Sequence, residues 1–312
     1  KLVSDRGTLG TTHGAQVAPN FWDVNTDQPG SSVTTNWGSS ATLDINLPAG
    51  MTLRSITAYR RYETNFSYDS DGSQVNKGFV KGHWPVDQLS EELQLSAIWE
   101  RWQWVMGLYY YNQKTHSRTP TEVKLDYLFP PGLTFDSINR VETDTDSYAA
   151  FGSARYALTD RVSLEAGIRY SVDKKSMSVD AESRLSFLPA PIPLEQRLSD
   201  RWNAVLPRFG VDYRPTDQVM VYASAARGYK PGGFVFFVPQ ANNFLNPEYV
   251  WNYETGFKTD WLDKKLRVNA SFFYSQYKDL QVFAVVNGIG QQANAAEATI
   301  KGVELEVQAR TV

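Results

Sequence analysis

The chain has 312 residues, a formal net charge of −3 from 31 basic and 34 acidic residues, and no cysteine. The balanced charge gives no reason to expect nucleic acid as a partner, and the lack of cysteine excludes disulfides, thiolate metal sites and cysteine nucleophiles. No run of about 18 apolar residues occurs, which excludes a transmembrane helix. Aromatic residues make up 13% of the chain, which fits an aromatic-rich soluble β protein or an outer-membrane barrel.

Alternation of apolar and polar residues with a period of two runs along almost the whole chain and predicts β-strands. In the clearest stretch, 162–173, Val162 and Leu164 alternate with Ser163 and Glu165. Many of the predicted strands exceed the five or six residues of an average globular strand, which suits tilted strands that cross a bilayer. Eleven strands are predicted, at residues 35–47, 51–66, 88–100, 102–116, 140–157, 161–180, 202–213, 218–228, 248–261, 265–281 and 299–311.

Short and long connections alternate between these strands. The short ones are mostly rich in Pro, Gly and Asp, as tight turns require, and lie at 48–50, 100–101, 159–160, 215–217 and 262–264. The long ones lie at 67–87, 117–139, 181–201, 229–247 and 282–298. An antiparallel meander puts every second connection at the same end, so the pattern predicts short periplasmic turns and long extracellular loops. Residues 1–34 are predicted to be one more extracellular loop.

Several segments are typical of one family of membrane proteins. Near the C-terminal end these are AARGYKPGGF at 225–234, NPE at 246–248, NYETGFK at 252–258, YKDLQ at 277–281 and IKGVELE at 300–306. Further matches lie upstream at 92–95, 104–111 and 164–170. Taken in this order, over about 35–311, they resemble the barrel of a TonB-dependent outer-membrane receptor.

The resemblance implies an all-β fold, a transmembrane antiparallel up-and-down barrel of 22 strands with an N-terminal plug domain in its lumen. Residues 1–312 would form part of that barrel, about half of its strands, without the plug and the final strands. The implied function is energised uptake of a scarce, bulky solute, most often an iron-siderophore complex, with no enzymatic activity and no cofactor. The implied partners are outer-membrane lipid and lipopolysaccharide, the solute, and the TonB complex, which acts through the plug.

The predicted loops supply the candidate contacts to the solute, which are His83, Trp84, Lys230, Phe234, Phe236 and Phe237. The apolar run that begins at Phe234 either lines a ligand vestibule or packs loop against loop. The histidines His13, His83 and His116 either touch a metal chelate or are solvated. The stretch YDSDG at 68–72 is either a calcium turn or a plain polar turn, because the full twelve-residue calcium loop is absent.

By the same resemblance, the polar strand faces line the lumen and contact the plug through Glu165, Arg169, Glu254, Lys258, Arg267, Asn269, Glu304 and Glu306. Aromatic residues that suit the lipid–water interface are Trp102, Trp104, Trp251 and Trp261. The stretch WNYETGFKTDW at 251–261 has an aromatic face toward lipid and a charged face toward the lumen. Its length of about 34 Å, tilted by about 45°, rises roughly 24 Å, close to the apolar band of such barrels.

Other functions remain open at this point. A passive outer-membrane porin or channel shares the alternation and the loop asymmetry, and a soluble secreted β-rich binding protein shares the composition. An outer-membrane enzyme is disfavoured because no Ser/His/Asp constellation is evident. Cobalamin, haem, other metal chelates and oligosaccharides fit the barrel as well as an iron-siderophore does.

Overall fold

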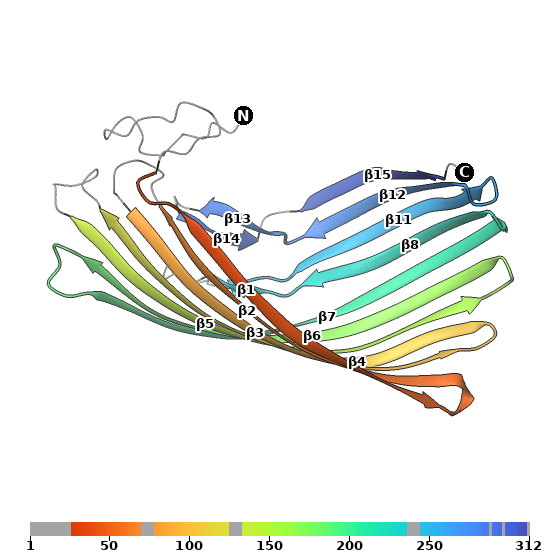
Figure 1. The fold of residues 1–312 in the computed structure, drawn as a ribbon, viewed down its shortest axis with the longest axis horizontal. Coiled ribbons are helices and arrows are strands. Elements are labelled where there is room, and N and C mark those ends of the chain that lie inside the picture. The colour runs from red at the N-terminus through yellow and green to blue at the C-terminus, as the bar shows by residue number, and fades with distance from the viewer. Residues whose placement is uncertain are drawn as a thin grey trace.

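The molecule is built around one antiparallel sheet of eleven strands, in the order β1-β2-β3-β4-β5-β6-β7-β8-β11-β12-β15 (Figure 1). The computed structural model describes residues 26–69, 78–124, 133–235, 244–286, 289–294 and 297–310. Neighbours in the sheet follow one another along the chain, so the predicted up-and-down meander is confirmed. Within the described residues the sheet is open, because β1 pairs only with β2 and β15 only with β12.

The strands are long in the first two thirds of the chain and shorter after that. The main sheet contains β1 (Ser31–Leu47), β2 (Met51–Asp69), β3 (Gly78–Ile98), β4 (Trp102–Lys124), β5 (Thr134–Ala157), β6 (Val162–Leu185), β7 (Ile192–Thr216), β8 (Val219–Lys230), β11 (Glu248–Trp261), β12 (Leu266–Lys278) and β15 (Ala298–Ala309). Two short antiparallel pairs lie in the connections, β9 (Gly233–Phe234) with β10 (Phe244–Leu245), and β13 (Gln281–Val286) with β14 (Ile289–Asn294). A single 3-10 turn, Pro48–Gly50, joins β1 to β2.

All the tight turns lie at one end of the sheet, on the right of Figure 1. The β1–β2 turn is tight enough that Ala49 and Gly50 both have positive φ, at 61° and 69°. In the β11–β12 turn, Leu262, Asp263 and Lys264 are also left-handed. Short turns at one end follow from the meander, as predicted.

The predicted strand boundaries are wrong at the opposite end. There β3 begins at Gly78 instead of residue 88, β4 runs to Lys124 instead of 116, and β7 begins at Ile192 instead of 202. The predicted loop 1–34 also overlaps β1, which begins at Ser31, while residues 1–25 lie outside the described part. These extensions escaped the prediction because each contains a proline, Pro85, Pro120 or Pro193, which argues against a strand. The apolar residues on their inner face, such as Val80 and Val86, are too few to restore a clear alternation.

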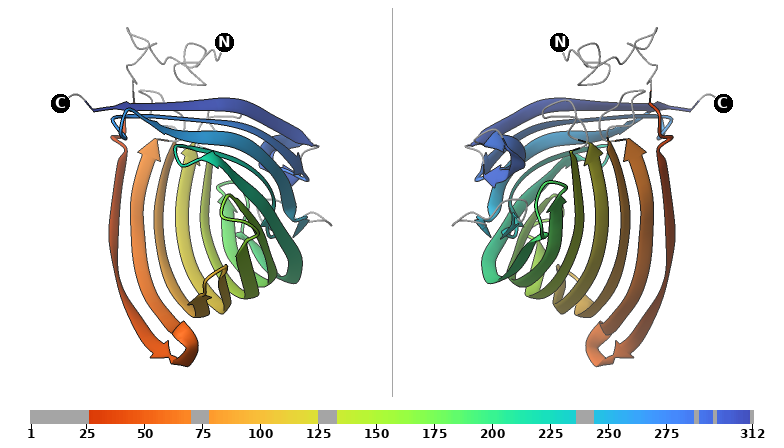
Figure 2. Two further views of the ribbon diagram at one scale, coloured as in Figure 1. Left: turned by 90° about the vertical axis from the view of Figure 1, so that its right-hand side faces the viewer. Right: turned by 90° about the vertical axis from the view of Figure 1, so that its left-hand side faces the viewer.

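The two faces of the sheet differ sharply. Phe234 of β9 packs against Val141, Met177 and Val179, and we call the side of the sheet on which it lies the inner face. Figure 2 shows the sheet curving across its width, with β1 and β15 at the margins of a hollow. Side chains alternate between the faces along each strand, and directly paired residues share a face.

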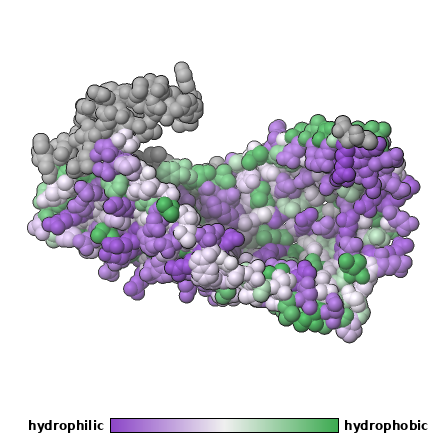
Figure 3. Space-filling view, viewed as in Figure 1, coloured by the Kyte–Doolittle hydropathy of each residue, from purple (hydrophilic) through white to green (hydrophobic). Residues whose placement is uncertain are grey.

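The outer face carries an apolar band near the short turns. One row across β4, β5 and β6 is Met106, Gly152 and Ile168, and Met106 and Ile168 are 52% and 57% exposed. A neighbouring row adds Leu108, which is 60% exposed, and Tyr170. At the short-turn end in Figure 3, hydrophobic residues follow the outer margins and hydrophilic residues fill the hollow between them. No helix among the described residues is long and apolar enough to cross a membrane.

Phenylalanine rings on the inner face cover glycines on the neighbouring strand. Gly107 of β4 is paired with Phe151 of β5, and a Cβ atom at Gly107 would lie 2.6 Å from both Phe151 Cζ and Leu93 O. Gly302 and Phe273 are paired in the same way between β15 and β12. The ring fills the space above the glycine and fixes the register of the two strands.

We expect Gly107→Ala to destabilise the protein by about 1–3 kcal/mol, because the added methyl forces Phe151 out of its position. Gly152→Ala is the matched control, since a Cβ there meets nothing closer than 3.6 Å. Guanidinium unfolding of the full-length protein in detergent measures the difference. Equal midpoints for the two variants would contradict the packing role of Phe151.

Candidate functional site

The eight polar residues predicted to line a lumen lie on the inner face. Strand pairing places Glu165 in one row with Gly210, Ser224 and Glu254, and the remaining members follow by alternation along the same strands. Lys258 pairs with Asn269, which pairs with Glu306. The eight residues therefore share one face of the sheet, whereas lining of a lumen and contact with a plug stay predictions.

Ion pairs cross the strands of this face. Glu165 Oε1 lies 3.2 Å from Arg208 Nε, and Arg155 pairs with Asp212. Alternation along the strands did not single out Arg155, Arg208 and Asp212 as members of the site. The cross-strand pairing that joins them depends on register, which a single strand's pattern does not contain.

Aromatic rings hold other charges of the inner face. The guanidinium of Arg169 lies 5.0 Å from the ring centroid of Tyr109 and 5.8 Å from that of Phe151. The Arg169 Nε also donates a hydrogen bond to Ser171 Oγ at 3.0 Å. Such cation–π contacts keep a charge in place without neutralising it, so Arg169 stays available to a partner in the hollow.

Further along the sheet the polar groups are paired with each other. The Tyr222 hydroxyl donates to Glu254 at 2.6 Å, and Lys258 Nζ lies 5.7 Å from the Tyr222 ring. Two other pairs lie nearby. Arg267 donates twice to Asp260 at 2.7 and 3.3 Å, and Asn269 donates to Glu306 at 2.9 Å. This end of the inner face is thus a wet, hydrogen-bonded wall.

Nearer the long connections, the segment after β8 folds back over the inner face. The Phe234 ring lies 5.8 Å from that of Trp202 and 5.5 Å from that of Phe244. Gly232 sits so close to the wall that a Cβ there would lie 2.3 Å from Leu245 O and 2.4 Å from Trp202 Cε2. The contacts of Phe234 therefore favour packing of this segment on the wall.

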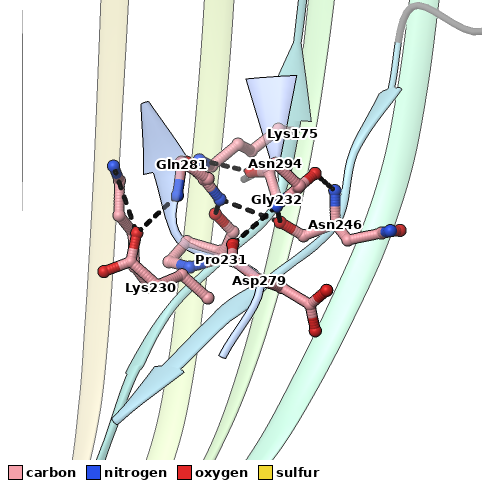
Figure 4. A network of polar contacts seen from close by, with 9 residues as sticks. Lys175, Lys230, Pro231, Gly232, Asn246, Asp279, Gln281 and Asn294 are labelled. Atoms are coloured by element: carbon pink, nitrogen blue, oxygen red, sulfur yellow. Dashed lines mark hydrogen bonds and ion pairs between the residues drawn. The ribbon is translucent and has the colours of Figure 1, made fainter. Parts of the chain in front are cut away.

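A network of backbone-directed hydrogen bonds holds this segment (Figure 4). Gln281 Nε2 donates to the carbonyl oxygens of Pro231 and Asn246, both at 3.0 Å. The Gln281 backbone N–H donates to Glu248 Oε2 at 2.9 Å, and Glu248 lies 4.0 Å from Lys230 Nζ. Three segments that are distant in the sequence, around residues 231, 247 and 280, thus meet through one glutamine.

Asn294 completes the network from β14. Its Nδ2 donates to the carbonyl oxygens of Asn246 at 3.0 Å and Asp279 at 2.7 Å, and its Oδ1 accepts from the Asn246 N–H at 2.8 Å. Asp279 is left-handed, with φ of 55°, a conformation that Asp tolerates better than most residues. The network therefore fixes the point where the chain leaves β12 for β13.

Lys175 ties the folded-back segment to the wall from the other side. Its Nζ donates to Gly232 O at 2.8 Å and lies 5.8 Å from the Trp202 ring. Burial lowers the pKa of the Lys175 ammonium from its ordinary value, with Asp173 opposing and Lys230 adding to the shift. The Gly232 carbonyl supplies the hydrogen bond that this buried ammonium needs.

The other predicted solute contacts are divided between the faces. Trp84 is on the inner face, donates to Thr119 Oγ1 at 3.2 Å and packs edge-on against Phe66. His83 belongs to β3, not to a loop, and points to the outer face, where it lies 2.8 Å from Asn65 and 3.5 Å from Glu63. His83 therefore does not line the hollow with Trp84.

Two of the predicted contacts, Phe236 and Phe237, lie outside the described residues, as does His13. Of the calcium turn, Tyr68 and Asp69 end β2, while 70–72 lie outside the described part, so calcium binding stays a prediction. His116 lines an outer-face hollow of about 670 Å³ together with Glu142 and Arg197. Within the described segments, no group of three or more metal-ligating side chains is close enough to hold an ion.

Comparison with known proteins identifies the class. The family described as "TonB dependent receptor-like, beta-barrel" matches residues 3–310. The chain therefore belongs to this family, as its sequence motifs and its antiparallel meander predicted.

Two curated relatives and one solved structure illustrate the likeness. The chain is 31% identical to the pesticin receptor of Yersinia enterocolitica over 210 residues, 66% of this chain and 28% of the receptor. It is 24% identical to the metal-pseudopaline receptor of Pseudomonas aeruginosa over 330 aligned positions, 98% of this chain and 45% of that protein. The ferric yersiniabactin uptake receptor of Yersinia pestis superimposes with a TM-score of 0.71 at 24% identity, covering 91% of this chain and 40% of that structure.

We expect Gln281→Leu to loosen the folded-back segment, because the carbonyls of Pro231 and Asn246 lose their shared donor. Amide hydrogen exchange of full-length protein in detergent is expected to accelerate about tenfold in β9 and β10. Gln276→Leu is the matched control, because Gln276 bonds only an exposed tyrosine, Tyr274, at 3.2 Å. Unchanged exchange in Gln281→Leu would mean that Phe234 packing alone holds the segment.

Proposed function

We propose that this chain is part of the barrel of an outer-membrane receptor that takes up a metal chelate, of the iron-siderophore type, driven by TonB. The observation that carries the proposal is membership of the receptor family over nearly the whole chain. The chain spans less than half the length of the relatives described above. Their named cargoes are pseudopaline-bound metal and ferric yersiniabactin, which supports a metal chelate as the solute class.

The distribution of side chains supports one orientation of the sheet in the membrane. The apolar band of Leu108, Met106 and Ile168 faces lipid, and the tight turns lie on the periplasmic side, as in other barrels of this kind. The long connections then lie outside the cell, next to lipopolysaccharide. Trp102 and Trp104 share the outer face with Met106 and belong to the lipid–water interface.

The inner face supports a plugged lumen more than an open channel. Its charges are unevenly satisfied: Glu165 and Glu254 are bonded to wall residues, whereas Arg169 is held only by rings and a serine. Charges that no wall residue neutralises, such as that of Arg169, suit a plug domain that docks against the wall. In a passive channel, water alone would solvate them.

We expect deletion of the gene to abolish uptake of at least one chelate from a panel of radiolabelled iron complexes that includes ferric yersiniabactin and ferric citrate. The full-length gene restores uptake, and a strain without TonB does not take up the same complex. Uptake that persists without TonB would instead establish a passive channel. No defect with any metal chelate would remove the proposed solute class.

We expect Leu43→Arg to destabilise the inserted protein by about 2–4 kcal/mol, the cost of an arginine well inside the apolar band. Leu43 lies on the outer face of β1, is 60% exposed and stands further from the turn at Pro48–Gly50 than Ile45 does. Asn46 of the same strand is exposed on the inner face, so Asn46→Arg is the control and should cost little. Unfolding from lipid vesicles measures both, and equal costs would place the outer face in water.

A further inference from the structure

Charged residues are segregated between the two faces in the part of the sheet near the long connections. On the outer face of β2, β3, β5 and β6, several charges occur in opposite pairs, such as Arg61 with Asp87 and Arg140 with Asp180. These pairs leave little net field, because each charge has an opposite neighbour within 4 Å. The inner face of β1–β5 in this region is different.

One row of paired inner-facing residues crosses β1–β5 through Ser40, Ala58, Ser90, Tyr111 and Ser147. Between this row and the long connections, the described part of these strands has one charged side chain on the inner face, that of Arg60. Most other inner-facing positions in this area carry hydroxyls, amides or rings, and the rest are glycine, alanine or valine. Examples of the polar and aromatic ones are Asn36, Tyr62, Gln88, Thr115 and Thr143.

Arg60 borders a recess in the inner wall. The recess has a volume of about 490 Å³, and its floor is low because Gly38, Ser40, Ala58 and Ser90 are small. Gln88 and Tyr111 stand on the far side, where Gln88 Nε2 and the Tyr111 hydroxyl both donate to Gln113 Oε1, at 2.9 and 2.7 Å. Arg60 is exposed and has no ion-pair partner among the residues that the structure describes.

We propose that Arg60 and this recess bind a carboxylate group of the transported solute. This rests on the proposed uptake function, because it places the solute in the hollow on the side of the long connections. A guanidinium offers two parallel N–H groups that match a carboxylate. The neutral hydroxyl, amide and aromatic groups around it suit an otherwise uncharged, oxygen-rich solute. They offer no second cation to a polyanion.

Arg60 is exposed on the inner face toward the long connections, which is where the proposed uptake function places the solute. A carboxylate of the receptor itself, for example on a domain inside the barrel, is the competing occupant, and it would leave the recess closed to added anions. The test therefore uses a small carboxylate whose binding needs a vacant recess.

The probe is benzoate, compared with benzamide, a neutral molecule of nearly the same shape. Purified full-length receptor in detergent is titrated with each, and binding is followed by isothermal titration calorimetry and by saturation-transfer NMR. We expect benzoate to bind at least tenfold more tightly than benzamide. Arg60→Met is expected to remove this difference, and Arg60→Lys to keep a reduced part of it.

Arg61→Met is the matched control, because Arg61 is the next residue, faces outward and already pairs with Asp87. It should leave the preference for benzoate unchanged. Equal binding of the two probes, absent binding of benzoate, or loss of the preference in Arg61→Met would each overturn the proposal. Failure of chelate uptake in cells with intact benzoate binding would contradict the uptake function and spare the carboxylate site. Intact chelate uptake without a preference for benzoate would contradict the carboxylate site and spare the uptake function.

Discussion

The constraint on which this structure depends is that a sheet one layer thick must satisfy two environments with alternate residues of the same strand. Met106 and Gly107 are neighbours in sequence, yet one is exposed on the apolar outer face and the other lies beneath a phenylalanine ring on the inner face. Since register fixes which residues share a row, a slip of one position would exchange the faces. The glycine–phenylalanine pairs oppose such a slip, because only one alignment brings each ring over its glycine.

This constraint also explains how far the sequence could predict the fold. Near the short turns one face is apolar and the other polar, so strands such as β6 and β11 were readily predicted. Toward the long connections the inner face mixes buried valines with glycines and polar residues, and proline interrupts the pattern, so the continuation of β3 from residue 88 back to Gly78 has only a weak alternating signal. Extension there depends on pairing with neighbours, for example Phe79 opposite Asp69 and Glu122, which no single strand reveals.

The candidate site divides in the same way. Membership of one face could be predicted from alternation, and the eight polar residues do share the inner face. Their partners could not, because Arg208 meets Glu165 across β7 and β6. The motifs around Gly232, Asn246 and Gln281 were recognisable as segments, but the network that joins them depends on two loop excursions returning to the same place. Short-range patterns contain no information about such convergence.

The segregation of charge shows why net charge is a poor guide to what this surface binds. Arg60 and Arg61 have adjacent Cα atoms, about 3.8 Å apart, but face different sides of the wall. Asp87 neutralises Arg61, and no described residue pairs with Arg60, so their fields differ although their charges are equal. A chain of net charge −3 can thus present an isolated positive centre to its hollow. Selectivity for an anion then follows from which charges are left unpaired, and that is set by the register between β2 and β3.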